Sequence, residues 1–218
     1  MKIAVCLFAY KRPNYLKRAL ATHKYLDGLT YYAFIDKSEI QNEIIGIIKD
    51  TKLYDMIIPR EQHMGIEANH IAGITFLFNK GYDAVIILED DWILHEETLG
   101  YLRRELELLQ YDNRFFSVSP YKEKFMALRF RAGIWGIWAD RWNKINWSNR
   151  PADRTYDVYL SAYIRKEKLY CRCASTQLIK HIGWGGTHVK WYDFFSVRRI
   201  LRKYFGWPPF ADYKEYQS

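Results

Sequence analysis

Three consecutive carboxylates, Glu89, Asp90 and Asp91, follow an apolar run at residues 84–88. Adjacent carboxylates at the end of a buried strand repel one another and lose hydration unless a cation or hydrogen-bond donors meet them. A hard divalent ion satisfies them, with water and phosphate oxygens completing its shell. The alternative is an acidic cap and first turn of the following helix. The apolar strand before the carboxylates favours the metal.

The elements that must position these carboxylates alternate between strand and helix. Apolar runs predict strands at residues 3–9, 31–35, 54–58, 84–88 and 115–119, and helical periodicity predicts helices from Pro13, after Ser38, at 66–80 and at 97–110. Ser38 and Gln41 have the spacing of a capping box. This order predicts an α/β fold, a mostly parallel sheet with helices on both faces.

Ligands of such sheets bind beyond the carboxyl ends of the strands. Here those ends carry residues 10–12, Asp36 and the three carboxylates. After Arg129 the sequence becomes rich in Gly and Trp, with a helical pattern at 153–165 and an extended one at 170–174. We interpret this half as a substrate-facing lobe laid against the same sheet.

Composition narrows the classes of protein. The 218 residues are 49% hydrophobic and 27% charged, which excludes a disordered chain. A net charge of +8 favours a polyanionic partner such as nucleic acid, anionic lipid or a phosphorylated small molecule. Three cysteines cannot form a disulfide framework, and Cys171 and Cys173 lack the spaced partners of a zinc site. With no signal peptide or membrane-spanning run, we expect a cytoplasmic protein.

Several segments together resemble the GT-A-fold glycosyltransferases, most closely the N-acetylglucosaminyltransferase I group. Glu89-Asp90-Asp91 resembles the Asp-x-Asp motif of these enzymes. The other segments recur in the same order over residues 3–188: Tyr10-Lys11-Arg12-Pro13, Asp36, Ala68-Asn69-His70, Gly133-Ile134-Trp135-Gly136-Ile137 and Tyr156-Asp157-Val158-Tyr159. The resemblance implies a GT-A catalytic domain at 1–188, with a nucleotide-binding half at 1–120 and an acceptor- and sugar-facing half at 121–188.

The resemblance implies that Arg12, Asp36 and His70 bind the nucleotide. Arg12 can make two-pronged contacts to phosphate or to a uracil carbonyl, or it is a solvated residue after a strand. Asp36 can accept from uracil N–H, or it caps the helix ahead of Ser38. His70 is as readily a satisfied core histidine as a nucleotide ligand.

The remaining roles concern the sugar and the metal. The resemblance implies that Asp91 binds Mn²⁺ or Mg²⁺ bridging to the diphosphate, that Asp90 meets the ribose and that Glu89 meets the sugar or acceptor. It also implies that Trp135 lies beside the donor sugar, although most Trp residues are simply core. Such a metal neutralises charge on the leaving diphosphate.

The resemblance implies that Asp157 is the catalytic base, which deprotonates an acceptor hydroxyl as that oxygen attacks the anomeric carbon with inversion. Its alternative is an exposed acid in the first turns of a helix. The family's Trp-Asp-Asp-Trp block is Tyr-Asp-Val-Tyr here, so one acid is missing.

The segment at 177–188 departs from the group's Ser-Arg-Thr segment and is more similar to other GT-A enzymes with a His-Ile-Gly. In those enzymes a histidine of this region completes the metal shell. His181 or His188 could do so here, or both hydrogen-bond within a Gly-rich loop that orders over the nucleotide sugar.

The basic aromatic tail at 189–218 contains an amphipathic pattern at 194–207, with arginines and a lysine opposite apolar residues. This pattern is typical of peripheral contact with an anionic membrane, or of a terminal helix docked on its own core.

The leading hypothesis is a metal-dependent glycosyltransferase that moves a sugar from a UDP-sugar such as UDP-GlcNAc to a glycan, protein or lipid-linked acceptor. One alternative is a non-catalytic nucleic-acid-binding protein, disfavoured because the basic residues are spread and no nucleic-acid module is present; we expect no nucleic-acid partner. Another is a nucleotidyltransferase, disfavoured because no Gly-rich loop follows the first strand.

Overall fold

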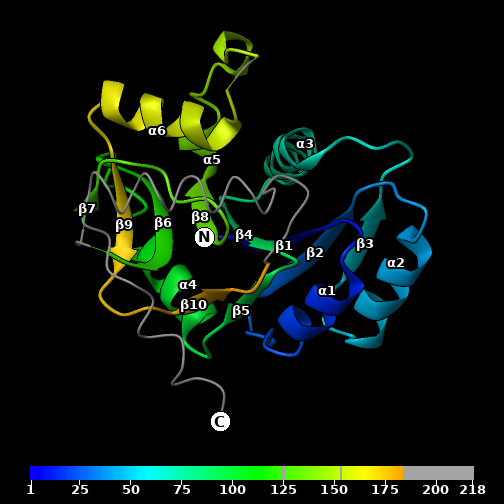
Figure 1. Cartoon of the computed structure of the whole chain (residues 1–218). Coiled ribbons are helices and arrows are strands. Elements are labelled where there is room, and N and C mark those ends of the chain that lie inside the picture. Colours follow the sequence, from blue (N-terminus) through cyan, green and yellow to red (C-terminus); the bar gives the residue numbers. More distant parts are fainter. Residues whose placement is uncertain (124–125, 153, 184–218) are drawn as a thin grey trace, which may run out of the picture. The chain divides into compact units, whose positions relative to one another are not determined.

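The computed structural model describes residues 1–123, 126–152 and 154–183, and in them one central sheet has the strand order β3-β2-β1-β4-β8-β6-β9-β7 (Figure 1). Its strands are β1 (Ile3–Ala9), β2 (Leu29–Ile35), β3 (Met56–Pro59), β4 (Ala84–Glu89), β6 (Phe115–Lys122), β7 (Met126–Ala127), β8 (Trp135–Trp138) and β9 (Tyr170–Ala174). Two short strands, β5 (Trp92–Leu94) and β10 (Ile179–His181), pair antiparallel with each other.

Helices cover both faces of the sheet because the strands are apolar on both sides. The helices are α1 (Pro13–Leu20), α2 (Gln41–Asp50), α3 (Ile66–Asn79), α4 (Thr98–Leu108), α5 (Ala139–Trp142) and α6 (Tyr156–Lys166), with a 3-10 turn η1 at Trp147–Asn149. Alternate residues of β1 point to opposite faces, so Val5 and Leu7 pack with α1, α2 and α4. Cys6 and Phe8 pack on the other face with α3, α5 and α6.

The second half of the chain completes the same sheet. β8 is antiparallel to β4 on one side and to β6 on the other, and β9 is parallel to β6. The expected α/β architecture with a mostly parallel sheet and flanking helices is therefore confirmed, with β8 and β7 as its antiparallel strands.

The capping-box prediction for α2 is wrong. Ile40 occupies the N-cap position and makes no side-chain cap hydrogen bond. The Gln41 side chain instead donates to the carbonyls of Ile35 (3.2 Å) and Arg60 (2.9 Å). Gln41 thus holds the ends of β2 and β3 together, and this buried role removes it from the helix cap.

The strand register brings three chain segments to one edge of the sheet. Ala9 of β1 is paired with Ile35 of β2, and Phe8 is paired with Glu89 of β4. Tyr10, Asp36 and Asp90 therefore leave the sheet side by side, as the parallel order predicted.

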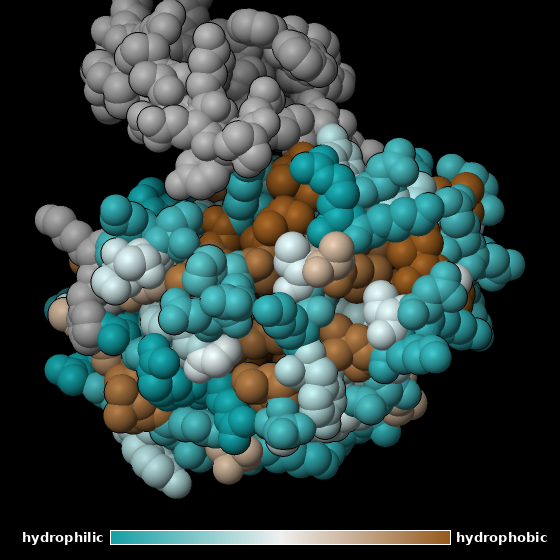
Figure 2. Space-filling model, turned by 90° about the horizontal axis from the view of Figure 1, so that it is seen from below, coloured by the Kyte–Doolittle hydropathy of each residue, from teal (hydrophilic) through white to brown (hydrophobic). Residues whose placement is uncertain are grey.

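Residues Met1–Ile182 form one compact unit, and the predicted boundaries at 120 and 188 stay predictions. Cys6, Cys171 and Cys173 are free and buried. Among the described helices, none has the length and apolar character needed to cross a bilayer. The tail at 189–218, including the predicted membrane contact at 194–207, lies outside the described residues. The face in Figure 2 is mainly hydrophilic, with hydrophobic residues showing between the polar ones.

Candidate active site

The centre of the candidate site is the carboxylate cluster, which we define as Glu89, Asp90 and Asp91. Asp90 is 2% exposed and Asp91 is 4% exposed, at the turn between β4 and β5. Burial, together with the charges of Asp91 and Asp90, raises the pKa of Glu89 to about 8. Burial also raises the pKa of Asp90, against the opposing charge of Arg12. Glu89 and Asp90 are therefore short of positive charge.

Arg12 supplies positive charge to the cluster. It stands at the N-cap of α1, just before Pro13, where the chain has left β1. One guanidinium nitrogen, Nη1, donates to Asp91 Oδ2 at 2.5 Å, and Nη2 pairs with Asp90 Oδ1. The backbone N–H of Tyr10 donates to Asp90 Oδ2 at 3.2 Å. Arg12 was expected to bind nucleotide, but in this structure its two-pronged contact is with the two aspartates.

His181 contacts the cluster from the far end of the described chain. Its Nε2 lies 3.1 Å from Asp91 Oδ2, and the Ile182 N–H donates to the Asp91 carbonyl at 2.9 Å. The antiparallel pairing of His181 with Trp92 fixes this position, and their rings lie 4.6 Å apart. Burial would raise the pKa of Asp91, but the His181 hydrogen bond and the charge of Arg12 outweigh it, so that pKa is lowered.

A glycine makes room for the Trp92 ring. A Cβ on Gly133 would lie 2.7 Å from Trp92 Cζ2, and Gly133 has φ of 95°. Both the close approach and the left-handed backbone require glycine here. Trp92 in turn packs edge-on against Tyr121, with ring centroids 5.5 Å apart. The chain segment that begins at Gly133 thus supports the carboxylate cluster, because its glycine leaves room for the Trp92 ring next to Asp91.

The residues present fit a divalent metal in part. Asp91 Oδ1 is buried and has no hydrogen-bond partner among the described residues, and the neighbouring His181 imidazole is half-exposed. A carboxylate oxygen and an imidazole nitrogen are suitable ligands for Mn²⁺. Within the described ranges, no group of three or more His, Cys, Asp or Glu side chains is arranged to hold a metal. Asp91 and His181 would hold it together with phosphate oxygens and water, and His188 lies outside the described residues.

Asp36 organises the loop that leads into α3. Its Oδ1 accepts from the N–H groups of Lys37 and Met64, and its Oδ2 accepts from the Gly65 N–H at 2.9 Å. His63 Nδ1 also lies 2.9 Å from Asp36 Oδ2. Both oxygens are therefore engaged by protein, and the expected contact with uracil stays a prediction.

Sequence reasoning missed His63. Its ring stacks on the Tyr10 ring with centroids 4.8 Å apart, so an aromatic pair stands beside Asp36 at the carboxyl end of β1. The available signal was its place in the short connection between a strand and Gly65, which has φ of 76° and caps α3. Such connections lie at the ligand-binding edge of the sheet.

His70 lies inside the protein. It is 1% exposed, its Nδ1 is 3.0 Å from the Tyr156 hydroxyl, and its ring is 4.1 Å from that of Phe8. Burial lowers the pKa of His70 to about 3, so the imidazole is uncharged. Its Nε2 is buried without a hydrogen-bond partner among the described residues. The expected nucleotide contact stays a prediction beside this core role.

Trp135 and Asp157, two further site residues predicted from the sequence, make no hydrogen bond with the carboxylate cluster within the described residues. Trp135 is 0% exposed in β8, where it pairs with Ile87 and packs edge-on against Phe130 at 4.7 Å. Asp157 is half-buried in the first turn of α6. Within the described part of the chain, no hydrogen bond or ion pair joins Asp157 to the carboxylate cluster. The sugar contact of Trp135 and the catalytic role of Asp157 stay predictions.

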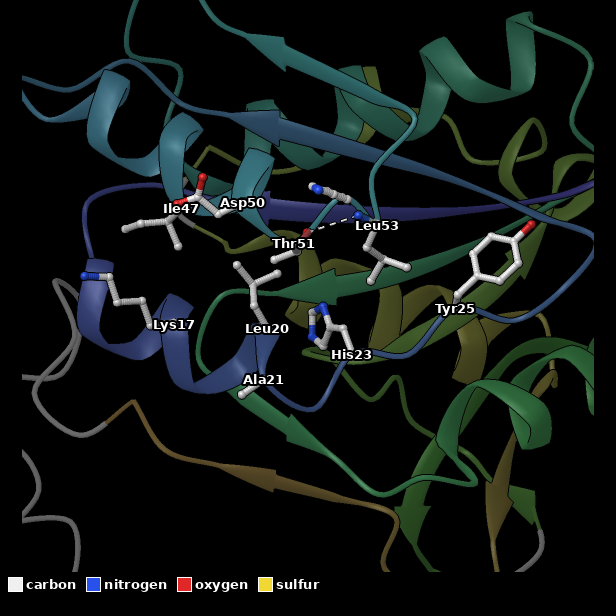
Figure 3. A pocket seen from close by; sticks show the side chains of 10 residues that line it. Lys17, Leu20, Ala21, His23, Tyr25, Ile47, Asp50, Thr51 and Leu53 are labelled. Carbon is white, nitrogen blue, oxygen red and sulfur yellow. Dashed lines mark hydrogen bonds between the residues drawn. The ribbon is translucent and has the colours of Figure 1, made fainter.

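A cavity of about 660 Å³ lies at the other end of the strands, away from the carboxylate cluster (Figure 3). Its lining comes from the end of α1 and the loop after it, and from the end of α2 and the segment before β3. His23 is buried there beside the Tyr54 hydroxyl, 2.8 Å away, and burial lowers its pKa to about 4. Because this edge carries the amino ends of β2 and β3, it is not where such sheets bind substrate.

Comparisons with known proteins identify the fold. No protein-family model matches the chain, and no curated protein does. A mannosyltransferase from Pyrobaculum calidifontis, solved with GDP-Man and Mn²⁺, matches with a TM-score of 0.63 at 12% identity, over 91% of this chain and 60% of that one. This chain therefore spans less than two thirds of that enzyme's length.

Two further structures are similar. A cytidylyltransferase from Leptospira borgpetersenii matches with a TM-score of 0.55 at 13% identity, over 82% of this chain and 77% of that one. A putative nucleotide-diphospho-sugar transferase from Desulfovibrio desulfuricans matches with a TM-score of 0.51 at 12% identity, over 79% of each chain. None of the three points to the N-acetylglucosaminyltransferase I group. The chain has a nucleotide-diphospho-sugar transferase-like, GT-A-like fold.

Proposed function

We propose that the protein is a metal-dependent glycosyltransferase that uses a nucleoside diphosphate sugar. One observation carries the proposal: Asp90 and Asp91 are buried at the ligand-binding edge of a GT-A-like sheet, with His181 Nε2 3.1 Å from Asp91. A site of buried carboxylates attracts a diphosphate only through a cation. The solved mannosyltransferase with GDP-Man and Mn²⁺ supports this class of donor.

In the proposed reaction, Asp157 takes the proton of an acceptor hydroxyl. The acceptor oxygen forms a bond to the anomeric carbon while the bond from that carbon to the diphosphate oxygen breaks, and the nucleoside diphosphate leaves with inversion at carbon. Asp91 and His181 would hold the divalent metal, which supplies charge neutralisation for the leaving diphosphate. Arg12 would be free to bind the diphosphate once a cation has taken its place beside Asp90 and Asp91. The first donor to test is a UDP-sugar.

The test is calorimetric titration of the full chain with UDP, GDP and CDP, with and without Mn²⁺. We expect Mn²⁺-dependent binding of one nucleotide, weakened at least tenfold by Asp91→Ala. The exposed Asp27→Ala is the matched control and should bind as wild type does. Absence of binding to all three diphosphates in Mn²⁺ would reject the proposed function.

A nucleotidyltransferase is the second candidate, favoured by the match to the cytidylyltransferase. The sequence counts against this candidate, because residues 10–13 are Tyr-Lys-Arg-Pro where a Gly-rich phosphate loop would follow the first strand. The chain is to be incubated with a nucleoside triphosphate and a sugar 1-phosphate, and pyrophosphate is measured. Release of pyrophosphate assigns nucleotidyl transfer, whereas release of nucleoside diphosphate from a nucleotide sugar assigns glycosyl transfer.

A further inference from the structure

A separate cavity of about 490 Å³ lies between α4 and the carboxyl end of β9. Its polar lining comes mainly from α4, β9 and the segment that follows β9: Tyr101, Arg104, Glu105, Arg172, Ser175 and Thr176. Two more carboxylates, those of Glu97 and Glu123, complete it. None of these residues belongs to the proposed donor site.

The cavity shares an edge of the sheet with the carboxylate cluster. β8 is antiparallel to both β4 and β6, so β6 and its parallel neighbour β9 run in the same direction as β4. The segment after β9 is anchored at Leu178, which donates to the Pro120 carbonyl and accepts from the Thr98 hydroxyl at 2.6 Å. It continues directly into β10, whose His181 contacts Asp91. The three residues from Leu178 to His181 span at most about 10 Å.

A buried hydroxyl in this lining lacks a partner. Tyr101 is 8% exposed, and its hydroxyl oxygen is buried without a hydrogen bond to any described residue. Burial, with the charge of Glu105, raises the pKa of Tyr101, so the phenol keeps its proton. Leaving a buried hydroxyl unpaired is costly, and a ligand oxygen in the cavity would satisfy it.

The charges of the lining exclude a polyanionic ligand. Glu105 is 4% exposed and is paired with Arg172 through a contact of 2.7 Å, so these two charges cancel. Arg104 lies 3.7 Å from the same Glu105 carboxylate, and Glu97 and Glu123 add two further carboxylates to the lining, so it has no excess of positive charge. What remains is a mixture of carboxylate acceptors, guanidinium donors and hydroxyls around an aromatic ring. Hydroxyl groups of a ligand can both donate to and accept from such a set.

We propose that this cavity binds a neutral carbohydrate at a site separate from the transfer centre. The cavity lies on the α4 face of the sheet, whereas Asp157 of α6 lies on the other face, so the bound sugar is not the acceptor that Asp157 would deprotonate. Carbohydrate binding in the cavity does not rest on the proposed function.

The experiment blocks the cavity without disturbing the fold. A Cβ added at Gly100 of α4 meets nothing within 4 Å, and leucine is a good helix former, so Gly100→Leu fills the cavity from a helix that accepts it. Gly46 of α2 also has open space at its Cβ, which makes Gly46→Leu the matched control. Tyr101→Phe removes only the unpaired hydroxyl.

The probes are the methyl glycosides of glucose, galactose, mannose and N-acetylglucosamine, measured by saturation-transfer NMR on the full chain without nucleotide. We expect a signal from at least one glycoside that Gly100→Leu abolishes, Gly46→Leu keeps and Tyr101→Phe weakens several-fold. No signal from any glycoside with wild type, or an equal signal with folded Gly100→Leu, overturns the proposal. If Gly100→Leu does not fold, an unchanged signal with Tyr101→Phe overturns it instead.

Nucleotide binding separates this proposal from the proposed function. Gly100→Leu should bind UDP and Mn²⁺ as wild type does, because the cavity takes no part in the donor site. Glycoside binding by a chain that binds no nucleoside diphosphate would support the cavity and reject the transferase.

Discussion

Glu89→Gln should stabilise the metal-free protein, and more so as the pH rises. The pKa of Glu89 is raised from 4.5 to about 8 by burial and by its two aspartate neighbours. Below pH 4.5 Glu89 is protonated in both the folded and the unfolded chain and costs nothing. Between pH 4.5 and 8 the unfolded chain ionises Glu89 while the folded chain resists, so wild-type stability falls. Glutamine has the same shape and cannot ionise.

The full shift corresponds to at most about 5 kcal/mol, since each pKa unit is worth about 1.4 kcal/mol. Glu89 keeps part of its surface in solvent, so we expect roughly half of that, about 2 kcal/mol, by pH 8. For a chain of this size this is a gain of about 4–8 °C in Tm.

The assay is thermal unfolding of wild type and Glu89→Gln in EDTA at pH 5, 6, 7 and 8, with the exposed Glu43→Gln as the matched control. The gap in Tm between wild type and Glu89→Gln should widen from pH 5 to pH 8, while Glu43→Gln follows wild type throughout. Parallel curves for wild type and Glu89→Gln would refute the view that the ionised Glu89 carboxylate is buried without a compensating cation. Saturating Mn²⁺ with UDP should narrow the gap, because the cation favours the ionised form.

Three other changes test the surroundings of the cluster. Arg12→Gln should lower the free energy of unfolding by about 2–3 kcal/mol in EDTA, because it removes the guanidinium from two buried aspartates and leaves only His181 beside Asp91. It should also tighten the binding of Mn²⁺ alone, measured by electron paramagnetic resonance, and weaker Mn²⁺ binding would contradict this. Gly133→Ala should cost about 2–3 kcal/mol in chemical denaturation, because φ is 95° and the new Cβ would meet the Trp92 ring at 2.7 Å, whereas Gly46→Ala should be neutral or stabilising. His70→Phe should make the free energy of unfolding depend less on pH between pH 7 and pH 4. In wild type the pKa of His70 is about 3 in the folded chain against 6.5 in the unfolded chain, so the unfolded chain takes up the proton first and the protein loses on the order of 3 kcal/mol over this range. The same slope in wild type and His70→Phe would contradict this.

The first half of the fold could be predicted closely because its signals are local. The uninterrupted apolar run at Ile3–Ala9 is β1 as expected, and the helix predicted at 66–80 is α3, Ile66–Asn79. Buried parallel strands and the helices between them have patterns that tertiary context rarely overrides. The same alternation correctly brought residues 10–12, Asp36 and the carboxylates to one edge.

The second half could not be predicted in the same way. β8 contains Trp135 and Gly136, and its glycine is there because a Cβ would lie 2.9 Å from Leu106 of α4. When contacts with a packed helix determine the residue types of a strand, the sequence of that strand shows no regular alternation of polar and apolar residues. β5 and β10 have three residues each and exist only as a pair, so the position of His181 beside Asp91 depends on a contact between segments about 90 residues apart.

The contact of Arg12 with both aspartates links two roles that looked independent in the sequence. Arg12 cannot grip a diphosphate while its nitrogens bind Asp90 and Asp91, and Asp91 Oδ2 is shared between Arg12 and His181. A divalent cation at Asp91 would repel the guanidinium and replace its charge, and the released Arg12 would then face the phosphates that the cation attracts. Metal and nucleotide must therefore bind cooperatively in the proposed function, each weakly alone. The same contacts explain how three adjacent carboxyl groups are tolerated in the folded chain before any ligand binds: Arg12 pairs with Asp90 and Asp91, His181 contacts Asp91, and the raised pKa of Glu89 keeps that group protonated at neutral pH.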